Sequence, residues 1–143
     1  MKTNELRIGN WVYVPSFKYY NDEEDGFGKV KSINQDSIDV YPFKKLRYDK
    51  IEPIELTEEV LLKIGFKKDK YDWWGYFPDR ENKISILMTD NYTIIEYANL
   101  FHCPEDVTEV NYGSTLEFPR RIYLHQLQNV YYCLTNEELE VEL

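Results

Sequence analysis

The sequence predicts an α+β protein, with a small SH3-like β module followed by an antiparallel β meander that two helices cover. Short stretches that alternate apolar and polar residues recur within residues 1–56, as in half-buried strands. Further alternating stretches lie within residues 71–97 and are separated by turn residues. Residues 57–64 and 122–134 instead space their apolar residues at the 3.6-residue period of a helix.

The first module is predicted over residues 1–56 as a set of short strands. LRIGNWVYVP (6–15) places apolar residues at alternate positions, with Gly-Asn as a break or bulge. After an acidic loop, KVKSI (29–33) and SIDVY (37–41) alternate on both sides of a turn, and LRYDKIEPIEL (46–56) supplies the last strand. So many short strands are typical of a small twisted sheet or an SH3-like barrel.

The second module is predicted over residues 57–143, and we expect both modules to pack as one compact unit. Its first helix starts at a threonine that can cap it and stops at a glycine. The predicted elements, in chain order, are a helix (57–64), strands within 71–97, a mostly loop segment (98–116), a helix (122–134) and a final alternating strand (139–143).

The second helix has a polar face opposite its apolar one. His125, Gln128 and Asn129 lie on this polar face, at spacings of three and four or at adjacent positions. Such a face is either solvated or strand-capping, or it is a hydrogen-bonding platform for a ligand or partner. Because amides do not titrate, the platform would serve recognition better than catalysis. We therefore name these three residues as candidate contacts.

The stretch DWWGYF (72–77) is the other candidate surface. In a strand, Trp74 and Tyr76 point to one side, and Trp73 and Phe77 point to the other. If one pair is left uncovered, it forms an exposed aromatic patch, which is typical of a binding surface. Otherwise both sides are buried. Trp73, Trp74 and Tyr76 complete the predicted contact set.

Three segments carry a resemblance to a known family: ELRIGNWV (5–12), IEPIELTEEVLLKIGF (51–66) and YLHQLQNVYYCLTNEELEVEL (123–143). They resemble a family of small uncharacterised proteins from gut anaerobic bacteria and their phages and prophages. The resemblance implies a phage or mobile-element context. It brings no activity and no catalytic residues to this chain.

The charge distribution disfavours nucleic acid as a partner. The net charge is −9; residues 1–56 hold nine basic and ten acidic residues, and residues 57–143 hold eight and sixteen. An acidic surface repels phosphate backbones. One alternative remains in the first module, where basic residues alternate with Tyr41, Phe43 and Tyr48 and could hold a single strand. These basic residues are Lys29, Lys31, Lys44, Lys45, Arg47 and Lys50.

The sequence predicts no metal, no cofactor and no catalytic group. His125 and Cys133 are separated by about 12 Å along a helix, too far to share one ion. His102 and Cys103 have no second ligand pair at zinc spacing, and a nucleophile built from Cys103 and His125 lacks an activating local signature. The glycines at 26–28 are not followed by a helix, so they form no phosphate loop.

We therefore expect a non-enzymatic binding protein of phage or mobile-element origin, whose partner is another protein. The alternatives are single-stranded nucleic-acid binding by the first module and binding or sponging of a small nucleotide ligand. The N-terminus lacks the apolar run of a signal peptide, and no segment is long enough to span a bilayer. We expect a cytoplasmic protein without membrane contact. Assembly into a homo-oligomer is left open by the sequence.

Overall fold

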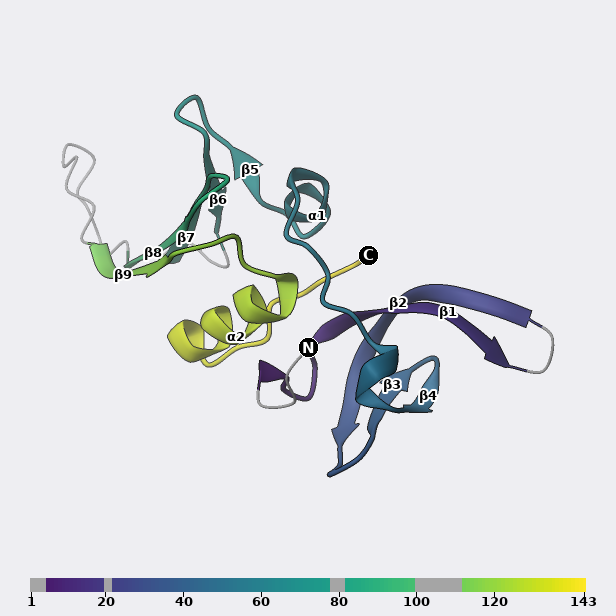
Figure 1. Cartoon of the computed structure of the whole chain (residues 1–143). Coiled ribbons are helices and arrows are strands. Elements are labelled where there is room, and N and C mark those ends of the chain that lie inside the picture. The colour runs from purple at the N-terminus through teal and green to yellow at the C-terminus, as the bar shows by residue number, and fades with distance from the viewer. Residues whose placement is uncertain (1–4, 20–21, 78–81, 100–111) are drawn as a thin grey trace, which may run out of the picture. The chain divides into compact units, whose positions relative to one another are not determined.

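The computed structural model forms two compact units (Figure 1). It describes residues 5–19, 22–77, 82–99 and 112–143. Unit 1 comprises residues 1–56 and 123–140, and unit 2 comprises residues 57–122 and 141–143. The chain thus leaves unit 1 after Leu56 and returns to it at Tyr123. The predicted module boundary is corrected accordingly: residues 123–140 belong with the N-terminal residues.

Unit 1 contains an antiparallel sheet whose four strands follow one another in chain order. The strands are β1 (Trp11–Tyr19), β2 (Asp22–Ile33), β3 (Ile38–Tyr41) and β4 (Lys44–Leu46). A 3₁₀ helix, η2 (Tyr48–Lys50), follows β4. Tyr13 and Glu52 then exchange two backbone hydrogen bonds of 2.9 and 2.8 Å, so the segment after η2 covers the outer edge of β1.

The core of unit 1 comes from one side of this sheet, as the alternation in the sequence predicts. Its members are buried aliphatic side chains: Leu6, Val12, Val14, Val30, Ile38, Val40, Leu46 and Ile51. Phe43 and Tyr48 pack against this cluster. Gly28 permits the close approach of β2 and β3, because a Cβ atom there would collide with Val40 and lie 2.9 Å from the Tyr41 carbonyl oxygen.

Unit 2 contains a second antiparallel sheet, again with its strands in chain order. The strands are β5 (Lys67–Lys68), β6 (Trp73–Tyr76), β7 (Asn82–Met88), β8 (Thr93–Asn99) and β9 (Tyr112–Phe118). Helix α1 (Glu58–Lys63) begins where predicted, with the Thr57 hydroxyl accepting from Val60 N at 3.3 Å. It ends at Lys63, and Gly65 follows the C-cap residue Ile64 with a φ of +92°, which suits glycine. Strand β9 lies in a segment that the sequence analysis took mostly as loop.

Helix α2 (Leu124–Thr135) belongs to unit 1, so the prediction that both helices cover the second sheet is corrected. The physical reason is visible at its first turn. Leu124 N donates to the Ile54 carbonyl oxygen at 2.9 Å, and Tyr123 forms a bridge with Glu55. These backbone bonds fix the start of the helix beside the segment that leaves unit 1.

The predicted final strand is absent: residues 139–143 are described and have no strand pairing. Leu139 and Val141 are nevertheless buried, so their alternation reflects side-chain burial without a ladder. The broad α+β class is confirmed, with two antiparallel sheets and few helices. Among the described helices, none has the length and apolar character needed to cross a membrane.

The register of β6 separates the two tryptophans, and this predicts different effects of substitution. Trp74 pairs with Ile86 on the core side and is 3% exposed, whereas Trp73 pairs with Leu87 on the opposite side and is half-buried. Trp74→Ala should lower the free energy of unfolding of unit 2 by about 3–5 kcal/mol. Trp73→Ala should cost no more than about half of that. Equal costs in chemical denaturation would contradict this register.

Candidate functional site

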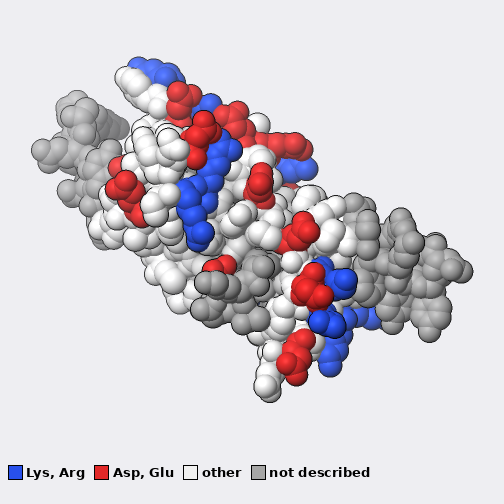
Figure 2. All heavy atoms as spheres, in the orientation of Figure 1, with Lys and Arg blue, Asp and Glu red and all other residues white. Residues whose placement is uncertain are grey.

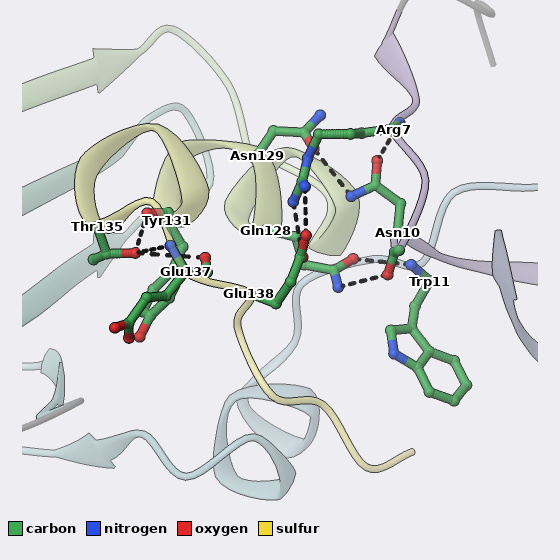
Figure 3. A network of polar contacts seen from close by, with 10 residues as sticks. Arg7, Asn10, Trp11, Gln128, Asn129, Tyr131, Thr135, Glu137 and Glu138 are labelled. Atoms are coloured by element: carbon green, nitrogen blue, oxygen red, sulfur yellow. Dashed lines mark hydrogen bonds and ion pairs between the residues drawn. The ribbon is translucent and has the colours of Figure 1, made fainter. Parts of the chain in front are cut away.

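Gln128 lies at the centre of the polar face of α2, and its side chain is buried. Its Oε1 accepts a hydrogen bond from Trp11 N at 2.9 Å, and its Nε2 donates to the Gly9 carbonyl oxygen at 3.4 Å (Figure 3). The amide therefore pairs with the backbone at the start of β1 much as a neighbouring strand would. Gln128 was predicted as a candidate contact for a ligand or partner, with a strand-capping face as the alternative, and its contacts here are those of the strand-capping alternative.

Asn129, the next residue of α2, binds the residues that precede β1. Its Oδ1 accepts from Asn10 Nδ2 at 3.0 Å and from Arg7 Nε at 3.4 Å, and its Nδ2 donates to the Glu5 carbonyl oxygen at 2.9 Å. Asn10 is fully buried, and its Oδ1 accepts from Arg7 N at 2.8 Å. The side-chain amides of Asn10 and Asn129 are thus both hydrogen-bonded within the chain.

Arg7 extends the network to the segment after α2. Its two terminal nitrogens donate to the two carboxylate oxygens of Glu138 at 2.5 and 2.9 Å, a bidentate arrangement (Figure 3). The guanidinium carbon lies 4.0 Å from the centre of the Tyr132 ring. The hydrogen bond from Arg7 lowers the pKa of Glu138, so the pair stays ionised at neutral pH.

His125 is fully buried, and neither of its ring nitrogens has a hydrogen-bond partner within the described structure. Its ring stacks on Tyr123, with the ring centres 5.9 Å apart. Burial lowers the pKa of His125 to about 4 and outweighs the opposing effect of Glu5. The imidazole is therefore neutral at physiological pH.

The predicted recognition face on α2 is thus corrected. His125 and Gln128 are buried and Asn129 is half-buried, and both amides bind residues 5–11. We call these contacts the amide network; it consists of Arg7, Asn10, Trp11, Gln128, Asn129 and Glu138. Helical periodicity identified a polar face correctly, but it does not distinguish water from the backbone of another segment.

The aromatic stretch in unit 2 is divided between the core and the surface. Trp74 is buried, and Tyr76 stacks on Phe66 with ring centres 5.1 Å apart. Trp73 is half-buried on the other side of the strand. Phe77 is 57% exposed, with Lys83 Nζ 5.6 Å from its ring centre. Of the three residues that the sequence analysis named here, only Trp73 lies on the side away from the core.

A larger aromatic surface lies on the side of the unit 1 sheet that faces away from its core. In the strand pairing, Trp11 lies opposite Lys29 and Lys29 lies opposite Tyr41, while Tyr13 lies opposite Phe27. We call this surface the aromatic face and define it by Trp11, Tyr13, Phe27, Lys29 and Tyr41. Three residues that alternate with its members, namely Val12, Gly28 and Val40, are buried.

Two rings of the aromatic face are well exposed: Phe27 at 40% and Tyr41 at 68%. Tyr13 and Phe27 are in ring contact at 5.7 Å, and Lys31 Nζ lies 5.9 Å from the centre of the Tyr41 ring. Trp11, Tyr13 and Phe27 were not among the residues predicted from the sequence to form a binding surface. The sequence pattern that could have indicated this surface is the alternation of Trp11 and Tyr13 with two core valines.

The six predicted basic residues lie on β2, on β4 and at η2, and two of them have acidic neighbours. Lys29 and Lys31 lie at the aromatic face, Lys45 lies opposite Asp39, and Arg47 pairs with Asp49 at 3.2 Å. The two other predicted residues, Lys44 and Lys50, are exposed. Phe43 and Tyr48, which were expected to alternate with these charges at the surface, pack on the core instead. Figure 2 shows acidic side chains beside basic ones over the visible face.

Comparison of the chain with protein-family models, with curated proteins and with solved structures found no match. Among the residues that the structure describes, no three His, Cys, Asp or Glu side chains gather as metal ligands would. Cys133 is a free, exposed thiol. The other cysteine and histidine that the sequence analysis considered, Cys103 and His102, lie outside the described residues.

The amide network predicts that Gln128 is needed for stability. Gln128→Ala should destabilise unit 1 by about 1–3 kcal/mol, because Trp11 N loses its acceptor in a half-buried position and a cavity is left at the buried amide. Cys133→Ala, on the same helix but exposed, is the control and should change stability by less than about 0.5 kcal/mol. Urea unfolding measures both. Equal stability of the two variants would contradict the structural role of the amide.

Burial of His125 predicts a pH-dependent stability. Its pKa falls from 6.5 to about 4 on folding, so the unfolded chain takes up a proton first as the pH falls. The contribution of the neutral, buried His125 to the stability of the folded state is fully present above about pH 6.5. The free energy of unfolding should decrease by about 2 kcal/mol between pH 7 and pH 5. His125→Leu should remove this part of the slope. An unchanged slope in the variant would show that His125 is not the titrating group.

Proposed function

We propose that this chain is a non-enzymatic binding protein whose partner is another protein, held at the aromatic face of unit 1. The observation that carries the proposal is the placement of aromatic rings on the side of the sheet opposite the core. Phe27 and Tyr41 leave 40% and 68% of their surface exposed. Interfaces between proteins are enriched in Tyr, Trp and Phe, and a partner would supply the missing burial.

We infer that unit 1 is an SH3-like module and unit 2 an antiparallel meander. For unit 1, support comes from four strands in chain order, a 3₁₀ helix after β4 and the closure of β1 by Glu52. For unit 2, support comes from the pairing of each strand with the next one in the chain. SH3 domains hold extended peptides in aromatic-lined grooves, which fits the aromatic face by analogy of fold.

The charges favour a protein over a nucleic acid. Unit 1 holds nine basic and thirteen acidic residues, and the net charge of the chain is −9. Lys29 and Lys31 flank Tyr41, but Asp39 and Asp49 lie close to the other basic residues. A polyanion would meet repulsion around this small basic group. We also propose that the protein is of phage or mobile-element origin and is located in the cytoplasm.

The proposal predicts that Tyr41 is an energetic centre of the interface. The protein is captured with its partner from the cells that produce it, the partner is identified by mass spectrometry, and binding is measured with purified components. Combined Phe27→Ala and Tyr41→Ala substitutions should weaken binding about tenfold or more. Folding of the variant is verified by circular dichroism.

Tyr71→Ala is the matched control, because Tyr71 has the same 68% exposure and also has a lysine nitrogen near its ring, at 4.8 Å. It lies in unit 2 and should leave the affinity unchanged. Retained binding in the Phe27/Tyr41 variant would overturn the proposal. Steeply salt-dependent binding of a single-stranded oligonucleotide that requires Tyr41 would replace it with the nucleic-acid alternative.

A further inference from the structure

Strand β9 is an open edge of the sheet in unit 2. It pairs with β8 on one side, and no described residue pairs with its other side. Residues 113–117 are all exposed. An open edge presents a row of backbone N–H and C=O groups that another strand can pair with.

The other sheet edges in the described chain carry features that disfavour such pairing, at β1 over part of the strand. Strand β5 has two residues, both exposed lysines, and β4 has three residues, of which Lys44 and Lys45 are exposed. The outer edge of β1 is covered at Glu52. Edge lysines and short edge strands oppose the addition of further strands. In contrast, β9 has seven residues with no lysine and no proline.

The core side of the unit 2 sheet is also incomplete at β9. A cross-strand row runs from Trp74 through Ile86 and Ile95 to Leu116. Its first three members are at most 3% exposed, but Leu116 is 39% exposed although it lies on the same side of the sheet. One more strand beyond β9 would cover Leu116. On its outer side, β9 thus has no backbone partner among the described residues, and its Leu116 side chain is incompletely covered.

We propose that β9 pairs antiparallel with β9 of a second copy of this chain, which joins two sheets into one. The strand YGSTLEF is suited to pairing with itself about Thr115. In that register Ser114 lies opposite Leu116 of the second copy, and Gly113 lies opposite Glu117. The single charge of the strand thus meets glycine, and like charges are not opposed. A two-fold axis uses the same surface on both copies, as an isologous interface requires.

The test is the mass of the full chain in solution, measured by sedimentation equilibrium over a wide range of protein concentration. The average mass should rise from 17.3 kDa toward twice that value as the concentration increases. Leu116→Lys and Thr115→Pro should each keep the chain monomeric. Leu62→Lys on α1, at another exposed leucine of the same unit, should dimerise as the wild type does. Circular dichroism verifies that every variant is folded.

The register is tested by cross-linking in a chain whose two native cysteines are replaced by serine. Thr115→Cys lies at the proposed axis and should form a disulfide between copies rapidly on mild oxidation. Asn91→Cys, in an exposed turn of the same sheet, should not. A wild type that is monomeric at every concentration, or a dimer that Leu116→Lys and Thr115→Pro both leave intact, would overturn the proposal. Neither result bears on the aromatic face of unit 1.

Discussion

The pairing of Gln128 with the backbone around Gly9 and Trp11 is the constraint on which unit 1 depends. These backbone groups belong to half-buried residues where β1 begins, and they would lose these hydrogen bonds if the amide were absent. The two partners are 117 residues apart in sequence. A loop of that length costs only modestly more entropy to close than a shorter one. The bridge between Glu55 and Tyr123 returns the chain to the point where it left unit 1.

This constraint changes how the sequence motifs are understood. Two of the three segments that carry the family resemblance, residues 5–12 and 123–143, are joined by the amide network. The polar residues that suggested a recognition platform therefore hold the fold together. A binding function then has to use other side chains, and exposed rings such as Tyr41 have no comparable structural task.

The sequence predicted those features that depend on local pattern alone. Alternation located parts of β1, β2 and β3, and Thr57 and Gly65 marked the ends of α1. Two predictions for unit 1 were wrong: residues 46–56 contain η2 and isolated bridges in place of a last strand, and the expected acidic loop lies largely within β1 and β2. The contacts of each element could not be predicted from the sequence. A periodic pattern shows which residues share a face, but it does not show which segment packs against that face. Strand β9 was missed since its Gly-Ser-Thr run has weak strand character and depends on pairing with β8. Residues 139–143 show the opposite case, in which clear alternation has no neighbouring strand.

The two proposed surfaces share one physical property, which is a scarcity of acidic side chains in a protein with a net charge of −9: the aromatic face has none among its defined residues, and β9 has only Glu117. Attraction at the aromatic face has to come mainly from apolar burial, and attraction at β9 from backbone hydrogen bonds together with the burial of Leu116. The net charge opposes the association of two copies, and added salt screens that repulsion. Salt should thus strengthen self-association while it weakens any contact with nucleic acid. Ionic strength therefore separates these two kinds of association without any substitution.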